Sequence, residues 1–155
     1  MGYTHYFRKK DGLTEANWGG FTEDVKKVLK DGKDIIQFEY DEDAPAIAND
    51  HYVRFNGIED EGHETFVLDY EKSRFDFCKT ARKPYDKYVT ACLILAKVHF
   101  GNEITVSSDG DLEDWNEGLE LVKGLTGITL DLTEDIKGKF QVAVTEKNGT
   151  VSTTS

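Results

Sequence analysis

Apolar side chains recur at helical spacing in three segments of the chain, and this pattern predicts three helices. The first helix is expected to have Thr22 as its N-cap and to end at Gly32. The second is expected to start with Pro84 at its first position. Its interior, residues 89–100, is apolar nearly all round, which is typical of a helix buried in the centre of a core.

The third predicted helix is capped by Asp109 or Asp111, keeps one apolar side and closes at Gly124. Around the helices, short runs of apolar and β-branched residues bounded by turn signals predict strands. The predicted strands are residues 2–7, 35–40, 51–56, 65–70, 103–107, 128–132 and 139–144.

The order of these elements, β-α-β-β-β-α-β-α-β-β, indicates an α+β fold in which about three helices pack on one face of a mainly antiparallel sheet. No repeat or proline-rich linker divides the chain, so we expect a single domain over residues 1–144. Residues 145–155 are mostly Thr, Ser, Asn, Gly and charged residues, and we expect them to form a polar, mobile C-terminal tail.

The composition narrows the classes of partner. The 155 residues include 30 acidic and 19 basic side chains, which gives a formal net charge of -11. Such a charge disfavours non-specific binding of nucleic acid and attachment to anionic membranes. The longest apolar run, residues 91–96, is too short to cross a bilayer, and the first six residues lack signal-peptide character. We therefore expect a cytoplasmic protein with no membrane partner.

Cysteine and histidine spacings predict no metal site and no cofactor. Cys78 and Cys92 form no disulfide framework, and we expect reduced thiols. The four histidines lie far apart in the sequence, without zinc-ligand spacing. His99, at the end of the second helix, is expected to interact with the helix dipole. A nucleophilic Cys78 has no histidine beside it in the sequence.

Residues 72–83 form a basic cluster in an acidic protein, with five cations and one carboxylate. Because the cluster precedes the second helix, it is expected to lie beside the free amides of that helix, as in sites that hold phosphate. The alternative is that Asp86 pairs with Lys83 or Arg82 as a structural clamp. The candidate phosphate-binding residues are Lys79, Thr80, Arg82 and Lys83.

Aromatic side chains accompany this cluster and the N-terminal segment. Aromatic faces near guanidinium groups suit the stacking of a base whose phosphate is held by cations. The alternative is that these rings belong to the core, with Phe75 and Phe77 on one buried face of a strand. The candidate stacking residues are Tyr3, His5, Tyr6 and Tyr85.

Four segments together resemble a family of small bacteriophage and prophage proteins whose function is not known. They are MGYTHYF at residues 1–7, RFNG at 54–57, FDFCKTARKPYD at 75–86 and VSSDG at 106–110. The likeness extends to about Gly127. It implies a phage origin and a role in the host cytoplasm, and it transfers no catalytic residue.

These observations favour a non-catalytic protein that binds a small ligand and sequesters a phosphate-bearing, nucleotide-like signal during infection. One alternative is an acidic protein inhibitor that mimics nucleic acid through residues 109–120 and 41–43 and binds a host protein. Another is a phosphodiesterase or other hydrolase that uses His5 or His63 as acid or base. A homo-oligomer with its pocket between subunits is a further candidate.

Overall fold

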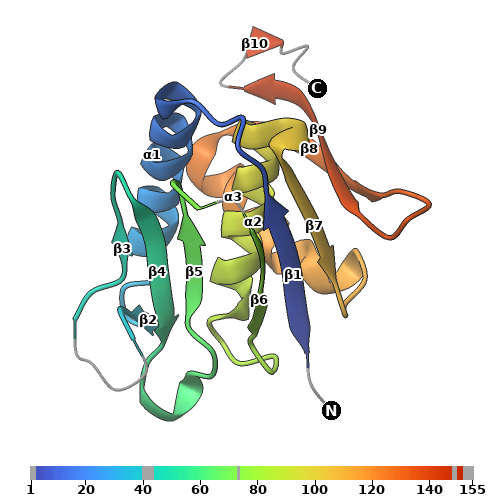
Figure 1. Cartoon of the computed structure of the whole chain (residues 1–155). Helices are drawn as coiled ribbons and strands as arrows, with labels where there is room; N and C mark the ends of the chain where they lie inside the picture. The colour runs from blue at the N-terminus through green and yellow to red at the C-terminus, as the bar shows by residue number, and fades with distance from the viewer. Residues whose placement is uncertain (1–2, 40–43, 73, 148–149, 152–155) are drawn as a thin grey trace.

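A computed structural model describes residues 3–39, 44–72, 74–147 and 150–151 of the chain (Figure 1). Three short 3₁₀ turns, η1 (Glu59–Glu61), η2 (Gly101–Glu103) and η3 (Glu113–Trp115), accompany the longer elements. The helices are α1 (Glu15–Asp31), α2 (Asp86–Phe100) and α3 (Asn116–Thr126). The strands are β1 (Thr4–Lys9), β2 (Ile36–Gln37), β3 (Ile47–Ala48), β4 (Tyr52–Gly57), β5 (Phe66–Asp69), β6 (Phe75–Lys79), β7 (Ile104–Ser108), β8 (Ile128–Glu134), β9 (Phe140–Lys147) and β10 (Thr150–Val151).

The fold is α+β, as predicted, and its strand pairs are antiparallel. Three sheets replace the expected single sheet. The first has the order β6-β1-β7, and the second is the β8–β9 hairpin extended by β10. In the third, β2 and β3 share one edge of β4 while β5 pairs with the other edge.

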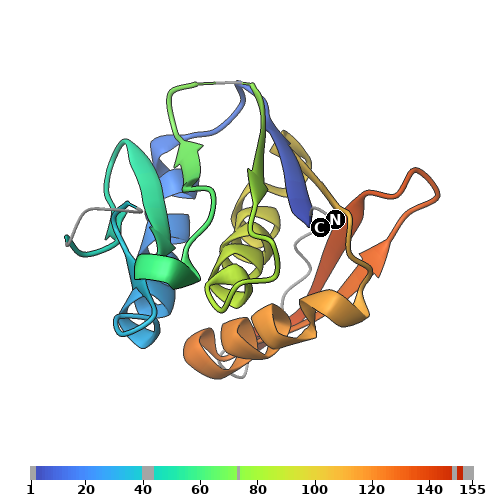
Figure 2. The ribbon, with the colours of Figure 1, turned by 90° about the horizontal axis from the view of Figure 1, so that it is seen from below.

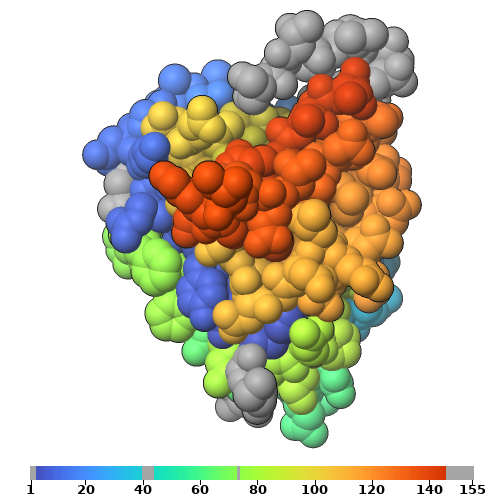
Figure 3. Space-filling model, turned by 90° about the vertical axis from the view of Figure 1, so that its right-hand side faces the viewer, coloured from blue at the N-terminus to red at the C-terminus, as the bar shows by residue number. Residues whose placement is uncertain are grey.

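Helix α2 lies in the centre of the core, as its apolar sequence predicts. Nearly all its side chains are buried, and α1, α3 and β7 pack against it. Figure 2 shows the helices on one side of β1, β5 and β6, with α2 between α1 and α3. The β8–β9 hairpin and α3 form the side of the molecule seen in Figure 3. None of the helices in the described ranges has the length and apolar character needed to cross a lipid bilayer.

Helix α1 begins at Glu15 with Thr14 as its N-cap, so the prediction of Thr22 as the cap is wrong. The backbone N–H of Asn17 donates to the Thr14 hydroxyl over 3.1 Å, and the backbone N–H of Thr14 donates to the Asn17 side chain over 3.2 Å. This reciprocal pair is a capping box. Thr22 lies inside the helix, where its hydroxyl donates to the Gly19 carbonyl.

The predicted ends of α2 and α3 are also shifted. Pro84 lies two residues before Asp86, the first helical residue of α2, rather than at its first position. Helix α3 continues past Gly124 and ends at Gly127, whose φ of 75° is in the left-handed region that glycine adopts readily. The prediction that Asp109 or Asp111 caps this helix is wrong, because α3 begins at Asn116 with Trp115 as its N-cap and no side chain caps it. The Asp111 carboxylate instead accepts the backbone N–H of Asp114 over 3.1 Å, in the turn that leads into α3.

Two further segments differ from the prediction. Strand β6 is absent from the predicted order, and it places Phe75 and Phe77 on an exposed face instead of a buried one. Strands β9 and β10 occupy the described part of the predicted C-terminal tail. Residues 148–149 and 152–155 of that tail lie outside the described residues, and so do residues 41–43, which were assigned to the candidate nucleic-acid mimic. The domain limits stay a prediction.

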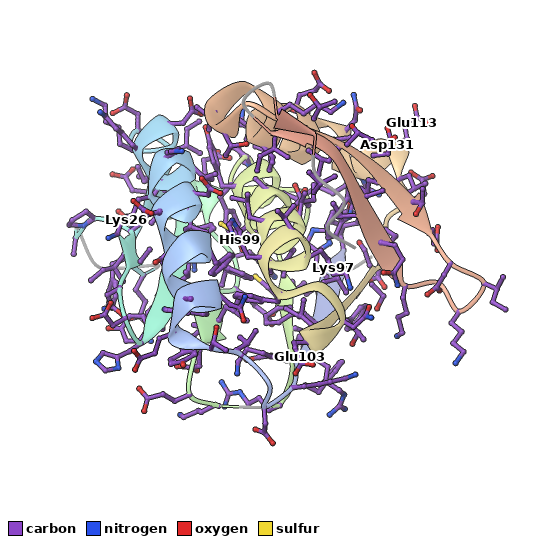
Figure 4. All side chains as sticks on the ribbon, turned by 90° about the horizontal axis from the view of Figure 1, so that it is seen from above. Lys26, Lys97, His99, Glu103, Glu113 and Asp131 are labelled. Atoms are coloured by element: carbon purple, nitrogen blue, oxygen red, sulfur yellow. The ribbon has the colours of Figure 1, made fainter. Side chains whose placement is uncertain are left out.

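The contacts near the end of α2 differ from the role expected for His99. The His99 imidazole contacts the Asp24 carboxylate of α1 over 2.8 Å, and Figure 4 shows it in the space between α1 and α2. The Lys97 ammonium instead donates to the carbonyls of Gly101 and Ile104, each over 2.9 Å. The cation at the end of α2 is therefore a lysine, and its burial lowers its pKa.

Candidate functional site

A cavity of about 680 Å³ lies at the N-terminal end of α2. Its walls come from the turn that joins β6 to α2, from the first turn of α2, and from the chain that leads into α3. The lining residues are Arg82, Lys83, Pro84, Asp86, Lys87, Asp111, Glu113, Asp114 and Glu117. This volume falls in the range typical of small-molecule sites, about 300–1,000 Å³.

The turn between β6 and α2 has an unusual backbone. Ala81 and Arg82 have φ values of 53° and 59°, in the left-handed region that non-glycine residues rarely adopt. Two contacts with the residue before β1 hold this conformation, because the backbone N–H groups of Thr80 and Ala81 both donate to the carbonyl of Tyr3. Such conformations cost about 1–3 kcal/mol each and are concentrated at functional sites. The strained turn projects Arg82 and Lys83 toward the cavity.

Arg82 has two partners at the cavity wall. Its guanidinium contacts the Asp114 carboxylate over 3.2 Å and lies 3.9 Å from the centre of the Tyr3 ring. The hydrogen bond with Asp114 raises the pKa of Arg82, while the Asp111 backbone N–H and Arg82 lower the pKa of Asp114. Both groups are therefore charged at neutral pH, although an exposed ion pair of this kind adds little stability.

The cavity is lined by charges of both signs. Arg82, Lys83 and Lys87 supply three cations, and Asp86, Asp111, Glu113, Asp114 and Glu117 supply five carboxylates. Lys83 also donates to the carbonyl of Asp60 over 3.2 Å. The site thus offers donors to an anion and acceptors to hydroxyl or amino groups, rather than a purely basic surface.

A buried hydrogen-bonded network supports the cavity from behind. The His5 ring is fully buried, and its two nitrogens contact the Ser108 hydroxyl over 2.7 Å and the Asp86 carboxylate over 2.6 Å. The buried Thr80 hydroxyl donates to the same carboxylate oxygen of Asp86. Asp86, which was predicted to clamp Lys83 or Arg82, is instead held by His5 and Thr80.

A second buried group fixes the other side of the β6–α2 turn. Tyr85 is fully buried, and its hydroxyl donates to the carbonyl of Glu64 over 2.6 Å. The Glu64 carboxylate accepts the backbone N–H of Lys79 over 2.7 Å. Cys78 is fully buried next to the Glu64 carbonyl, and burial raises its thiol pKa, so it is a poor nucleophile.

Among the predicted phosphate-binding residues, the structure brings Arg82 and Lys83 to the cavity. Thr80 lies behind the cavity wall, with its side chain engaged by Asp86. Lys79 lies at the end of β6 and is not a lining residue.

The four predicted stacking residues do not line this cavity. Tyr3, His5 and Tyr85 are buried, and burial together with the carboxylates of Asp86 and Asp114 raises the pKa of Tyr3 to about 12. Tyr6 lies on the outer face of β1, where its hydroxyl donates to Asp109.

Sequence reasoning missed most of the cavity wall. Lys87 is the second residue of α2, and nothing in the sequence distinguishes its charge from those of other surface lysines. The missed carboxylates belong to a run of acids before and within α3, and such a run is ordinarily a solvated surface. The contact of Arg82 with Asp114 joins positions 32 residues apart, so it leaves no local pattern.

The other histidines do not approach the cavity. His63 is exposed in the turn after η1, and His51 contacts Glu71 at the surface. Within the described ranges, no three His, Cys, Asp or Glu side chains gather closely enough to hold a metal ion.

Three of the four segments named in the sequence analysis, residues 1–7, 75–86 and 106–110, lie side by side. Strand β1 pairs with β6 on one side and with β7 on the other. Asn56 holds the turn before Glu64 through the backbone N–H and carbonyl of His63. A Cβ at Gly110 would lie 2.3 Å from the Tyr3 hydroxyl, which explains glycine at that position. Of these segments, residues 75–86 contribute lining residues to the cavity. Residues 1–7 and 106–110 contribute His5 and Ser108 to the network behind it.

Comparison of the chain with models of protein families, with curated proteins and with solved structures found no match.

Proposed function

We propose that the protein binds a small, phosphate-bearing, nucleotide-like ligand in the cavity at the start of α2 and does not convert it. The observation that carries this proposal is the composition of the cavity wall. Cations from the β6–α2 turn lie opposite carboxylates from the start of α3 in a space of about 680 Å³. A nucleotide carries both a phosphate and hydrogen-bond donors, so it matches both halves of this wall.

The phosphate is placed beside Lys83 and Lys87, with Arg82 as a third cation. The present partners of these side chains are the Asp60 carbonyl for Lys83, the Tyr88 ring for Lys87 and the Asp114 carboxylate for Arg82. Exposed contacts of this kind are weak, so a phosphate can replace them, and charge-assisted hydrogen bonds to phosphate are stronger.

The remaining ligand groups are placed near Asp111, Glu113 and Glu117. Carboxylates accept hydrogen bonds from ribose hydroxyls and from exocyclic amino groups of bases. The same carboxylates repel an anion that has no donors. The cavity should therefore bind a nucleotide more tightly than inorganic phosphate.

The position of the histidines supports binding rather than hydrolysis. His5 is fully buried with both ring nitrogens engaged, and His63 does not line the cavity. Together with the resemblance to phage proteins, this leads us to propose that the ligand is a signal captured in the host cytoplasm. The acidic segment 109–120 contributes to the cavity wall, so it is not needed as a nucleic-acid mimic in this account.

Isothermal titration calorimetry with linear and cyclic nucleotides tests the proposal. We expect binding of at least one nucleotide, with inorganic phosphate weaker. The double variant Lys83→Ala/Lys87→Ala should lose at least about tenfold in affinity, because each lysine would lose a charge-assisted hydrogen bond. Lys26→Ala, an exposed lysine on α1, is the matched control.

Chromatography of the same mixtures should recover the nucleotide intact. Absence of heat with every nucleotide would refute the proposed ligand class, and equal affinity of the double variant would refute the proposed site. Accumulation of a hydrolysis product would favour an enzyme.

A further inference from the structure

The sheet β6-β1-β7 has one face in the core and one face open (Figures 1 and 2). On the inner face, His5, Phe7 and Cys78 are buried. On the outer face, Phe75 and Phe77 are 47% and 50% exposed. No helix covers this outer face in the views of Figures 1 and 2.

The outer face combines aromatic rings with cations, and we call it the ring face. It consists of the outward side chains of three paired strands. Tyr6 lies opposite Phe77 on one side and Ser107 on the other, while Arg8 lies opposite Phe75 and Thr105. The ring face residues are Tyr6, Arg8, Phe75, Phe77, Lys79, Thr105 and Ser107.

The rings and the nearest cation form a contiguous group. The rings of Tyr6 and Phe75 are nearly parallel, with an interplanar angle of 18° and centroids 6.2 Å apart. The centroids of Phe75 and Phe77 are 6.4 Å apart. The Arg8 guanidinium lies 5.5 Å from the centre of the Phe75 ring. These contacts leave about half of each phenylalanine exposed to solvent.

Exposure of this kind is unusual for an antiparallel sheet. The solvent face of such a sheet is ordinarily polar. Full burial of a phenylalanine side chain stabilises a fold by about 1.5–3 kcal/mol, and an exposed phenylalanine does not make this contribution. Elsewhere in the described ranges, the one comparably exposed large apolar residue is Ile136, in the turn between β8 and β9. Two exposed phenylalanines side by side are therefore a candidate contact surface.

We propose that the ring face binds a short segment of single-stranded nucleic acid. Unpaired bases stack on Tyr6, Phe75 and Phe77, and Arg8 and Lys79 contact the phosphates. Base stacking on aromatic side chains beside cations is the general chemistry of such surfaces. The outward side chains of the ring face include the cations Arg8 and Lys79, and the one carboxylate in the described ranges that contacts its rings is Asp109, at the Tyr6 hydroxyl, so the part around Phe75 and Phe77 suits a phosphate.

The surrounding acidic side chains limit the length of the bound segment. Asp69 and Asp76, next to the ring face, both contact Arg74. Asp109 accepts the Tyr6 hydroxyl at the other end. Because the whole protein carries a net charge of -11, long strands and duplexes are repelled beyond this patch. The proposal therefore departs, for short single strands, from the expectation that the protein does not bind nucleic acid non-specifically, and keeps that expectation for long strands and duplexes.

A second copy of this chain is a poorer occupant of the ring face. In a two-fold symmetric dimer the same surface meets itself, so Arg8 and Lys79 of one protomer would approach those of its partner. Like charges placed together in an interface oppose association. The ring face and the cavity share no residue, so the two proposals are independent.

Fluorescence anisotropy with labelled eight-nucleotide oligo-dT and oligo-U tests the proposal, with a duplex of the same length as a control. Both single strands should bind and the duplex should not. Phe75→Ala and Phe77→Ala should each weaken binding by about 5- to 150-fold, the usual effect of losing one stacking partner. Ile136→Ala, which removes an exposed apolar side chain elsewhere, should leave binding unchanged.

The salt dependence checks the role of the two cations. With about two phosphate contacts, the logarithm of the association constant should fall with the logarithm of salt concentration with a slope of about -1.4. Arg8→Ala should reduce that slope by about half. Both phenylalanines are exposed, so their variants should retain the circular dichroism of the parent protein.

The proposal would be overturned if either single strand failed to bind, if the phenylalanine variants bound as tightly as the parent protein, or if the duplex bound as tightly as the single strands. It would also be overturned if sedimentation velocity showed a dimer that is lost in Phe75→Ala, because a second copy would then cover the ring face. Nucleotide binding in the cavity should be unchanged in Phe75→Ala, so failure here is distinguishable from failure of the proposed function.

Discussion

His5 lies where three separate segments of the chain meet. Its two ring nitrogens join the end of β7, through Ser108, to the first turn of α2, through Asp86. A buried imidazole without partners would destabilise the fold, whereas one with both nitrogens bonded fixes its neighbours. The network therefore holds the Asp86 carboxylate at the cavity wall in one orientation.

Asp24 is the residue whose charge should make stability depend on pH. Burial alone would raise its pKa, but hydrogen bonds from His99 and Lys27 outweigh burial and lower it. A depressed folded-state pKa stabilises the protein above the unfolded pKa, near about 4, and this contribution is lost as pH falls through the folded-state pKa.

Asp24→Asn should therefore lower the free energy of unfolding at pH 7 by about 2 kcal/mol, the usual loss for hydrogen bonds to a charged group. Urea unfolding between pH 7 and pH 3 measures this difference. We expect the difference between parent and variant to shrink as pH falls below about 4. A difference that stays constant over that range would contradict the role given to the Asp24 charge.

Individual site residues could be predicted only where their signal is local. Arg82 and Lys83 stand out because their charges are neighbours in the sequence, and both line the cavity. Tyr3, His5 and Tyr85 were expected to face a ligand. Their burial depends on partners far along the chain, such as Ser108 for His5, so no local pattern distinguishes a buried ring from a ligand-facing one.

At the scale of elements, the packing of α3 on α2 depends on one glycine. A Cβ at Gly118 would lie 2.1 Å from the Thr90 hydroxyl and 2.9 Å from the Ala91 backbone nitrogen. Gly124, on the same helix, has open space around its Cα. The two glycines therefore provide a matched pair for the same substitution.

Gly118→Ala should destabilise the protein by about 1–3 kcal/mol, because the helices must move apart. Gly124→Ala should stabilise it by up to about 1 kcal/mol, because alanine has the higher helix propensity. Thermal or urea unfolding of the two variants measures both effects. If the two alanines shift stability in the same direction, the close approach of α2 and α3 is wrong.

The elements were predictable where apolar periodicity dominates and less so at their ends. Helix α2 was found because its interior is apolar throughout. The start of α1 was placed eight residues too late, because Gly19 and Gly20 weaken the helical pattern before Thr22. Strand β6 was not among the predicted strands, because a sequence of aromatic residues with neighbouring cations is as typical of a surface loop as of a strand.

At the scale of the whole molecule, the fold class followed from the order of the elements, but the division into three sheets did not. Strand pairing joins segments such as β1 and β7, about 100 residues apart, and such contacts have no counterpart in a local pattern. The same pairing brings β6 and β7 to either side of β1, beside the cavity at the start of α2. The central claim of this account is that this cavity is a nucleotide site.

Amide NMR of the isotope-labelled protein, titrated with the same linear and cyclic nucleotides, tests that claim most directly. The account predicts that a bound nucleotide shifts the backbone signals of Arg82, Lys83 and Lys87 and of residues 111–117, and leaves those of Phe75 and Phe77 unchanged. A titration in which no nucleotide shifts the cavity signals, or in which the shifts are confined to other surfaces, would contradict it.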